Sequence, residues 1–327
     1  MMKIYVTRRI PEKGLDMIRE KFGEVDMNPD NRVLLHEELI ENVKGADAVL
    51  CQLTDKIDAD VMDSAGPSCK IFSNYAVGVN NIDFDAANER KIMIGNTPGV
   101  LTDATSTLAI SLMFSVARRI VEADRFMRGE NFEGWDPMLL LGNKVSGQTL
   151  GIIGAGRIGE DIAIKMHKGF GMNVLYTDLN GNEFLEDKTG AKKVDMDTLC
   201  KESDYISVNV NYYPETHHLI NEERLSLMKE NAIIVNTARG PVVDEEALVK
   251  ALQQKWIFGA GLDVFENEPK MKPGLKDLDN VVIVPHIGSA TFEARTKMSE
   301  MAAQNLIDAL EGRLPEFLVN KEVFNVK

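Results

Sequence analysis

Short apolar runs alternate with longer amphipathic segments along almost the whole chain, and this alternation restricts the fold more than any other feature of the sequence. A strand buried in a parallel sheet is a short apolar run, whereas a covering helix repeats its apolar residues every three to four positions. Parallel strands also need long crossover connections, which are usually helices. The sequence therefore predicts an α/β protein in which helices cover parallel sheets.

The first part of the chain predicts one such sheet, which ends before the turn-rich stretch Thr97-Pro98-Gly99. We expect a helix at residues 11–22, a loop at 75–81, and strands at 2–7, 48–52, 71–74 and 92–95. A long helix should follow at about 104–129, with Asp103 as its N-cap. Because apolar residues cover much of its circumference, we expect this helix to be buried between domains or subunits.

A second sheet is predicted from residue 149 onward. The apolar run 150–153 comes first, and further strands are expected at 173–177, 205–210, 232–236, 259–263 and 281–284. A last long helix, at 293–311, precedes a tail that we expect to return to the first sheet.

A glycine motif, GxGxxG, is formed by Gly154, Gly156 and Gly159. Glycines in this pattern permit a tight turn and let backbone N–H groups approach a pyrophosphate, which the N-terminus of the next helix also attracts. The motif alone is weak, because glycine-rich turns can match it. Here an apolar run precedes it and a helical pattern at 157–167 follows it, so we interpret it as a dinucleotide site.

An acidic residue, Asp178, stands 22 residues after Gly156, at the end of the next predicted strand. An acid at this place accepts hydrogen bonds from the adenosine ribose hydroxyls. The stretch 178–182 holds no Arg or Lys for a 2′-phosphate, and Asp178 would repel one. The sequence therefore favours NAD over NADP as the cofactor.

The position of the glycine motif in mid-chain indicates how the domains are arranged. We expect two doubly wound parallel-sheet (Rossmann-like) domains with a cleft between them. Residues 1–99 with 288–327 would form a discontinuous substrate-binding domain, and 100–287 an inserted NAD-binding domain that includes the linking helix.

Composition excludes several classes of partner. The 327 residues carry a net charge of −14 and a pI near 4.9, which argues against nucleic acid and against anionic membranes. An anionic substrate would therefore need a local cationic group. Three scattered cysteines, an N-terminus without an apolar signal region and the lack of a stretch of roughly 18 apolar residues predict a cytoplasmic protein.

Three later segments follow predicted strands, at the edge where open α/β sheets bind their ligands: 236–240, 261–269 and 285–289. Taken singly, Arg239 could be a surface cation, Glu268 a solvated turn residue and His286 a structural histidine. After a dinucleotide motif, the three together supply a clamp for a carboxylate, an orienting acid and a proton donor.

These segments resemble the D-isomer-specific 2-hydroxyacid dehydrogenase family, and most closely its glyoxylate/hydroxypyruvate reductase branch. The resemblance covers nearly the whole length. It is carried by Asn74-Tyr-Ala-Val-Gly-Val-Asn-Asn-Ile-Asp83, Leu101-Thr-Asp-Ala-Thr105, Trp135-Asp-Pro, Gly151-Ile-Ile-Gly-Ala-Gly-Arg-Ile-Gly159, Thr237-Ala-Arg-Gly, Phe265-Glu-Asn-Glu-Pro and Pro285-His-Ile-Gly-Ser-Ala.

The resemblance implies a catalytic trio. Arg239 would bind the substrate carboxylate and carbonyl with its planar fork. His286 would be the general acid in reduction and the base in oxidation, and Glu268 would orient it and favour its protonated form. The reaction needs no metal ion, since the proton goes to His286 and the hydride to nicotinamide.

The resemblance also implies the binding residues. The backbone at Val77 and Gly78 would receive the carboxylate, while Leu53 and a partner subunit's copy of Trp135 would close the pocket of a homodimer. The residues implied to contact the cofactor are Thr105, Gly154, Gly156, Arg157, Ile158, Gly159, Asp178, Thr237, Ala238, Asp263, His286 and Gly288. A hydroxymethyl group on the substrate would find a polar partner near Asn74 or Asn80.

The chain departs from the family pattern in two places. Asn209–Tyr213 stands where members usually show His, a hydrophobe and Pro, which puts the adenosine contacts of this loop in doubt, and Thr107 replaces a common Glu. The remaining histidines, His36, His167, His217 and His218, lack motif context, so we interpret them as surface or capping residues. The cysteines, Cys51, Cys69 and Cys200, should be buried and inert.

The predicted function is NAD(H)-dependent reduction of glyoxylate or hydroxypyruvate to the D-2-hydroxy acid, and the reverse. Two alternatives remain open at this stage. One is a D-lactate or other D-2-hydroxyacid dehydrogenase of the same family. The other is a non-enzymatic, corepressor-like NAD sensor, which can retain the trio.

Overall fold

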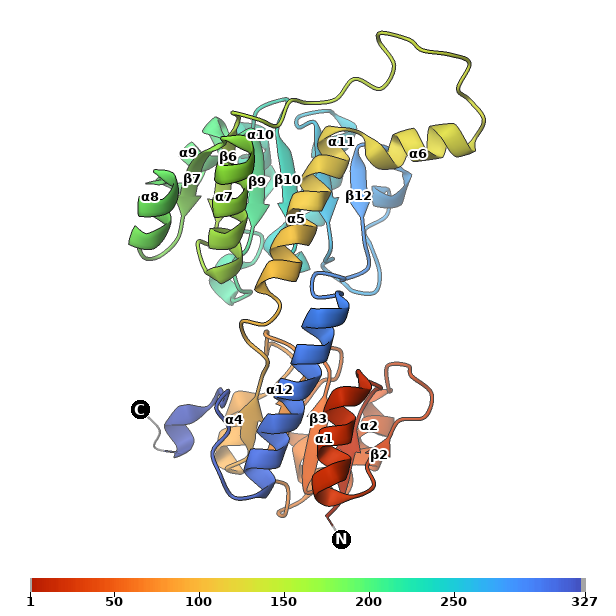
Figure 1. Ribbon diagram of the computed structural model, residues 1–327, viewed down its shortest axis with the longest axis vertical. Coiled ribbons are helices and arrows are strands. Elements are labelled where there is room, and N and C mark those ends of the chain that lie inside the picture. Colours follow the sequence, from red (N-terminus) through yellow and green to blue (C-terminus); the bar gives the residue numbers. More distant parts are fainter. Residues whose placement is uncertain (1, 325–327) are drawn as a thin grey trace. The chain divides into compact units, whose positions relative to one another are not determined.

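The computed structural model describes residues 2–324, and these residues divide into two compact units (Figure 1). Unit 1 contains residues up to Leu101 together with those from Ala290 onward, and unit 2 is the continuous stretch Thr102–Ser289. Each unit is a sheet of parallel strands covered by helices, so the predicted fold of two Rossmann-like α/β domains is confirmed.

Unit 1 has a five-stranded parallel sheet in the order β2-β1-β3-β4-β5. The strands are β1 (Ile4–Val6), β2 (Asp26–Met27), β3 (Ala48–Cys51), β4 (Ile71–Asn74) and β5 (Met93–Gly95). The helices are α1 (Glu12–Phe22), α2 (His36–Val43), α3 (Ala59–Ala65), α4 (Phe84–Glu89) and α12 (Phe292–Leu310), with a 3₁₀ turn, η4, at Lys321–Phe324.

Alternate residues of these strands face opposite sides of the sheet, so each strand serves two apolar cores. Ile4 and Leu50 pack with α1 and α12 on one side, whereas Tyr5 and Val49 pack with α2 and α3 on the other. Gly14 of α1 lies so near the backbone of Ser299 in α12 that a Cβ there would come within 2.3 Å of its carbonyl oxygen. The segment after α12 returns to this sheet as expected: the N–H of Val319 donates to the carbonyl of Ile94 at 2.7 Å.

Unit 2 has a seven-stranded parallel sheet in the order β12-β11-β10-β9-β6-β7-β8. The strands are β6 (Thr149–Ile153), β7 (Asn173–Thr177), β8 (Lys192–Lys193), β9 (Tyr205–Val208), β10 (Ile233–Asn236), β11 (Gly259–Leu262) and β12 (Val281–Ile283). The order reverses between β6 and β9, and this switch point is where open α/β sheets bind dinucleotides. The glycine motif follows β6 directly, so it lies at that point.

Helices cover both faces of the second sheet. They are α5 (Thr102–Ala117), α6 (Ile120–Arg128), α7 (Arg157–Phe170), α8 (Glu183–Thr189), α9 (Met196–Glu202), α10 (Glu222–Leu227) and α11 (Glu245–Gln253), with 3₁₀ turns η1 (Pro214–Thr216), η2 (Gly240–Val242) and η3 (Leu275–Asp277). Residues of α5 and α7 pack with Ile152 and Val235 on one face, and residues of α9, α10 and α11 pack with Ile153 and Ile234 on the other.

The prediction of a single helix at 104–129 is wrong. The chain forms α5 and α6, which are bent by 60° at a break where Arg119 has a φ of +51°. Asp103 is also not the N-cap: it lies inside α5, where its Oδ1 accepts a hydrogen bond from Lys165 Nζ at 2.7 Å. Much of α5 is buried against α7 and the sheet of its own unit, whereas α6 has no buried residue.

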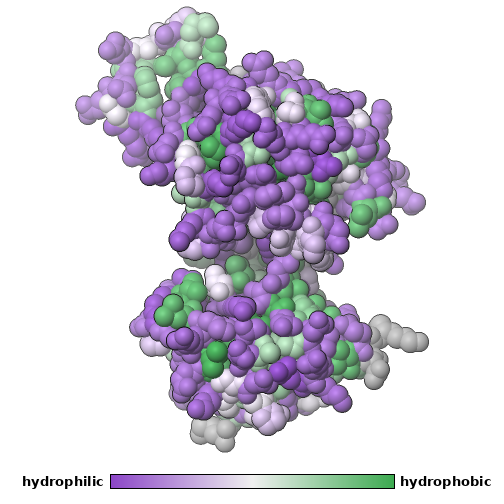
Figure 2. Space-filling view, turned by 180° about the vertical axis from the view of Figure 1, so that it is seen from behind, coloured by the Kyte–Doolittle hydropathy of each residue, from purple (hydrophilic) through white to green (hydrophobic). Residues whose placement is uncertain are grey.

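An arm formed by α6 and residues 129–143 therefore carries apolar side chains on its surface, which are visible as green atoms in Figure 2. The exposed members are Ile120, Met127, Phe132, Trp135, Met138 and Leu141. Between residues 2 and 324, no single helix has the length and hydropathy of a membrane span, and α5 with α6 meet that test only as a bent pair.

Candidate active site

The three glycines of the motif meet different surroundings. Gly154 has a φ of +89°, and a Cβ there would lie 2.9 Å from the backbone of Asn209. A Cβ on Gly159 would lie 2.1 Å from the carbonyl oxygen of Gly154, whereas one on Gly156 would meet no atom within 4 Å. The first and third glycines are thus required by the turn and by packing, and the second leaves open space at the N-terminus of α7, which begins with Arg157 and Ile158. This cradle fits the pyrophosphate of a dinucleotide.

Asp178 follows β7 and is tied to the same loop. Its Oδ2 accepts a hydrogen bond from the N–H of Ala155 at 2.8 Å, which holds the half-buried carboxylate beside the glycines. The next residue, Leu179, is almost fully exposed. An acid in this position can receive ribose hydroxyl groups.

The departure segment 209–213 lies next to the glycine loop. The N–H of Asn209 donates to the carbonyl of Ile153 at 2.7 Å, and the backbone of Asn209 closes on Gly154. Whatever replaces the usual family residues here therefore adjoins the expected cofactor path.

His286 and Glu268 form a direct pair. Nδ1 of His286 lies 3.0 Å from Oε2 of Glu268, and both side chains are partly open to solvent. Glu268 Oε1 accepts a second hydrogen bond from the N–H of Phe265. Burial opposes ionisation of Glu268, but the His286 hydrogen bond and charge, the Phe265 N–H and the charge of Arg239 outweigh it, so its pKa lies below the usual value. The glutamate is thus held as an anion beside the imidazole.

Asp263 organises the loop that carries His286. It is fully buried, and its two oxygens accept hydrogen bonds from the N–H groups of Ile287 at 2.6 Å and Gly288 at 2.8 Å. Burial raises the pKa of Asp263, while these N–H groups and His286 act against the rise. Thr105, buried in α5, lies close to Gly288, where an added Cβ would come within 3.4 Å of its methyl group.

Arg239 lies in a turn after β10, which also holds Thr237 and Ala238. The Asn236 side chain closes this turn, since its Oδ1 accepts from the N–H of Ala238 and its Nδ2 donates to the carbonyl of Arg239, both at 3.0 Å. Burial lowers the pKa of the Arg239 guanidinium, and the charge of Glu268 opposes that effect. Unit 2 thus brings the predicted trio into electrostatic contact.

The predicted substrate residues of unit 1 lie on two loops after β3 and β4. Asn96 Nδ2 donates to the carbonyl of Val77, and Asn74 Nδ2 donates to the carbonyl of Gly78, each at 2.9 Å. Within residues 2–324, the N–H groups of Val77 and Gly78 donate to no protein acceptor, so both are available to a ligand. The expectation that Asn74 could meet the substrate is wrong, because Asn74 is fully buried and its amide is already bound.

Asn81 joins the two loops, and no sequence signal had singled it out. Its Nδ2 donates to the carbonyls of Gln52 and Asp55, which flank Leu53, at 3.1 and 3.0 Å. Its Oδ1 accepts from Asn74 at 3.2 Å. Leu53 itself is exposed. The contacts of Asn81 depend on loops that come together only in the folded sheet.

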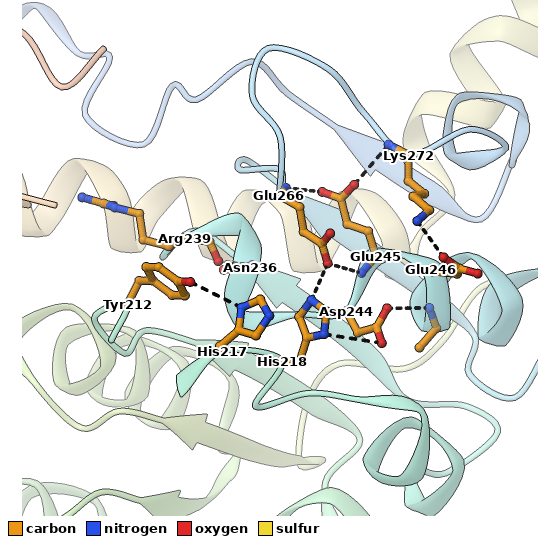
Figure 3. A network of polar contacts seen from close by, with 11 residues as sticks. Tyr212, His217, His218, Asn236, Arg239, Asp244, Glu245, Glu246, Glu266 and Lys272 are labelled. Carbon is orange, nitrogen blue, oxygen red and sulfur yellow. Dashed lines mark hydrogen bonds and ion pairs between the residues drawn. The ribbon is translucent and has the colours of Figure 1, made fainter. Parts of the chain in front are cut away.

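The remaining residues considered in the sequence lie outside the group formed by Arg239, Glu268 and His286. Trp135 lies on the arm, where 83% of its surface is exposed. The cysteines are free and buried, and burial raises the pKa of each thiol. His167 binds the carbonyl of Met172 at the end of α7, as a capping residue would. His218 is different: it contacts two carboxylates in a network that the motifs did not indicate (Figure 3).

Comparison with known proteins agrees with this geometry. Residues 110–288 match the family described as D-isomer specific 2-hydroxyacid dehydrogenase, NAD binding domain. A glyoxylate reductase of Thermococcus litoralis is 50% identical over 325 residues, which cover 98% of this chain and 97% of that protein.

Solved structures share the whole fold. The TT0316 protein of Thermus thermophilus superposes with a TM-score of 0.90 at 42% identity, covering 97% of this chain and all of that one. A glyoxylate reductase of Paecilomyes thermophila gives a TM-score of 0.86 at 32% identity, with 98% and 99% covered. The glycine loop, Asp178 after β7 and the residues Arg239, Glu268 and His286 all follow strands of one parallel sheet, and the chain belongs to the D-isomer specific 2-hydroxyacid dehydrogenase family and is an NAD-dependent oxidoreductase.

Proposed function

We propose that this enzyme reduces glyoxylate or hydroxypyruvate to the corresponding D-2-hydroxy acid with NADH, and catalyses the reverse reaction. The proposal rests on the 3.0 Å pair of His286 and Glu268, which lies at the strand ends of an NAD-binding unit with Arg239 in electrostatic contact. The identity with glyoxylate reductases supports the choice of small keto acids.

Each side chain has a distinct task in this proposal. Arg239 holds the substrate carboxylate and carbonyl, and the N–H groups of Val77 and Gly78 receive the carboxylate. His286 donates a proton to the carbonyl oxygen as the carbonyl carbon is reduced, and it takes that proton back in oxidation. Glu268 keeps the imidazole oriented and charged. NADH, when bound, supplies the hydride and leaves as NAD⁺, so one proton and one hydride are added to the keto acid.

The units divide the work accordingly. We assign substrate binding to residues 1–99 with 288–327, and cofactor binding to residues 100–287. The adenosine ribose would bind Asp178 and the nicotinamide end would meet Asp263. The remaining cofactor contacts would come from Thr105, Gly154, Gly156, Arg157, Ile158, Gly159, Thr237, Ala238, His286 and Gly288.

We further propose that the enzyme is a cytoplasmic homodimer. The exposed apolar side chains of the arm support a second copy of the chain as the partner, since such a patch is costly in water. A hollow beside α6, lined in part by Val121, Leu252, Ile257 and Phe258, offers apolar surface next to the arm. Trp135 would then reach the partner's active site. The three free thiols agree with a reducing compartment.

A panel of keto acids tests the substrate assignment. We expect kcat/KM to be highest for glyoxylate or hydroxypyruvate, lower for pyruvate and lowest for phenylpyruvate, because Leu53 and the partner's Trp135 leave space for a short substituent only. One methylene-sized group is worth only about 1–3 kcal/mol, so pyruvate should be slowed but not excluded. Loss of NADH absorbance measures each rate.

The variant Leu53→Ala should shift this preference toward larger acids. Leu35→Ala, an exposed leucine at the start of α2, serves as the control and should leave the ranking unchanged. A higher kcat/KM for phenylpyruvate than for glyoxylate and hydroxypyruvate in the wild type would contradict the pocket assignment.

The catalytic pair is tested by His286→Ala, which should reduce turnover by about 10²–10⁴-fold while NADH affinity stays nearly unchanged. Glu268→Gln should be milder. It removes the anion that stabilises the imidazolium, so the pH above which reduction fails should fall. His167→Ala is the control histidine, and pH profiles identical in wild type and Glu268→Gln would remove Glu268 from the mechanism.

Cofactor choice is tested by Asp178→Ser combined with Leu179→Arg. The wild type should strongly prefer NADH over NADPH, because the Asp178 carboxylate repels a 2′-phosphate, and the double variant should narrow or invert this preference. Asp187→Ser on α8 removes the same charge elsewhere in the unit and should change nothing. Equal kcat/KM for both cofactors in the wild type would disprove the role of Asp178.

Light scattering after size exclusion tests the dimer. The wild type should have twice the mass of one chain, and Met127→Glu on α6 should dissociate it because a charge would be buried in the interface. Phe184→Glu on α8 is a matched control, since the two side chains are 56% and 53% exposed. A fully active wild-type monomer at micromolar concentration is incompatible with the proposal.

A further inference from the structure

A polar network around His218 joins three segments of unit 2 that are distant in sequence (Figure 3). The segments are 217–220 after η1, 239–246 around η2 and the start of α11, and 263–272 after β11. The backbone already links the first two, because the N–H of His218 donates to the carbonyl of Pro241 at 2.8 Å. The third carries Glu268, and the second carries Arg239.

His218 is the basic side chain that two carboxylates share. Its Nε2 lies 2.9 Å from Oε1 of Glu266, and its Nδ1 lies 3.7 Å from Oδ2 of Asp244. The ring of His217 stacks on it with a centroid distance of 4.0 Å. His218 has a φ of +48°, in the left-handed region that asparagine, aspartate and histidine adopt more often than other non-glycine residues.

Glu266 in turn is locked to Glu245 at the start of α11. The N–H of Glu266 donates to Oε1 of Glu245 at 2.6 Å, and the N–H of Glu245 donates back to Oε1 of Glu266 at 3.0 Å. Oε2 of Glu245 accepts from the N–H of Lys272, at the far end of the same loop. Glu245 is 3% exposed, and burial raises its pKa against the effect of these N–H groups.

This locked loop sets the position of the catalytic groups. Glu268 stands two residues beyond Glu266, and the N–H of Phe265, the residue before Glu266, donates to the Glu268 carboxylate. Gly240, next to Arg239, packs against the backbone of Phe265, since a Cβ on Gly240 would lie 1.9 Å from the carbonyl carbon of Phe265. A shift of Glu266 must therefore move the supports of both Glu268 and Arg239.

Charge makes His218 important for that position. Asp244, Glu245 and Glu266 bring three carboxyl groups together, and the His218 ring, which hydrogen-bonds Glu266 and lies 3.7 Å from Asp244, stands between two of them. Lys272 points its ammonium group at Glu246 instead, at 2.7 Å. Without the Nε2 contact, Oε1 of Glu266 would lose one of its two hydrogen bonds and keep the one from the N–H of Glu245, which holds the carboxylate less firmly.

We propose that His218 is a positioning residue for keto acid reduction: through Glu266 it fixes the loop 263–272, and with it Glu268 and Arg239, in the geometry that binds and protonates the substrate. This inference rests on the proposed function of Arg239 and Glu268. His218 itself touches neither substrate nor cofactor.

Two variants separate this role from a general effect on stability. His218→Gln places an amide nitrogen where Nε2 stands and keeps the contact with Glu266. His218→Asn places its amide near the Nδ1 position and loses that contact. Asparagine tolerates the positive φ better than glutamine does, so the stabilities should rank Asn above Gln. The activities should rank in the opposite order.

The expected result is specific to the keto acid. His218→Asn should raise the KM for glyoxylate and lower kcat, with a total loss in kcat/KM of roughly ten- to hundredfold, since misplacement of catalytic groups by about 1 Å can cost that much. His218→Gln should stay within about threefold of the wild type. The Kd for NADH, measured by fluorescence, should change much less than the KM for glyoxylate in either variant, because the glycine loop and Asp178 lie outside the network.

A binding measurement keeps this test independent of turnover. Calorimetric titration of the NAD-loaded wild type and both variants with oxalate, a dicarboxylate that cannot be reduced, should show about tenfold weaker binding in His218→Asn only. A wild type that reduces no keto acid would overturn the proposed function, and the oxalate series would still decide whether His218 positions Arg239. Wild-type kcat/KM and oxalate affinity in His218→Asn, or equal losses in both variants that follow thermal stability, would overturn the inference.

Discussion

The constraint on which the rest of the structure depends is that all strands of each sheet run parallel. Parallel strands end at one edge, so the loops that follow β6, β7, β9, β10, β11 and β12 all emerge on the same side of unit 2. Those loops hold the glycine motif, Asp178, the departure segment, Arg239, Glu268 and His286. The topology of the sheet alone thus brings side chains that are spread along the sequence from residue 154 to residue 286 to the same edge of unit 2.

Local patterns were sufficient to predict the parts of the site that local geometry determines. The glycine turn, the strand ends and the segments with Arg239, Glu268 and His286 each lie within a few residues of a motif, and the structure pairs His286 with Glu268 while the charge of Arg239 acts on Glu268. The network of His218 and the bridge made by Asn81 could not be predicted from the sequence, because their partners come from distant segments. No spacing along the chain distinguishes a histidine that meets two carboxylates from one that faces water.

The break in the linking helix shows another limit. The stretch from Val116 to Val121 has no glycine or proline, and its residues are tolerated in helices, so propensity predicts continuity. The structure bends at Arg119, whose side chain binds Glu122 within the new helix. The apolar character that we read as burial over the whole segment holds for α5 but not for α6, whose side chains pack on no other part of unit 2 closely enough to be buried.

The charge distribution reconciles an acidic protein with an anionic substrate. The net charge of −14 would repel a keto acid at long range, whereas in the proposed function the guanidinium of Arg239 and the N–H groups of Val77 and Gly78 would attract its carboxylate at close range. Recognition in this proposal depends on a few groups held in place, and the nearby carboxylates Glu268 and Glu266 each accept two hydrogen bonds.

The packing of α1 against α12 has a consequence for how the chain acquires its structure during synthesis. Gly14 and Ser299 are in contact although most of the chain separates them in sequence. One apolar face of the N-terminal sheet therefore stays uncovered until the ribosome has made α12, the helix that follows unit 2. Unit 2 is one uninterrupted stretch and can complete its own core first. The part of the protein made earliest is thus the last to close, and one apolar face of its sheet stays uncovered while translation continues.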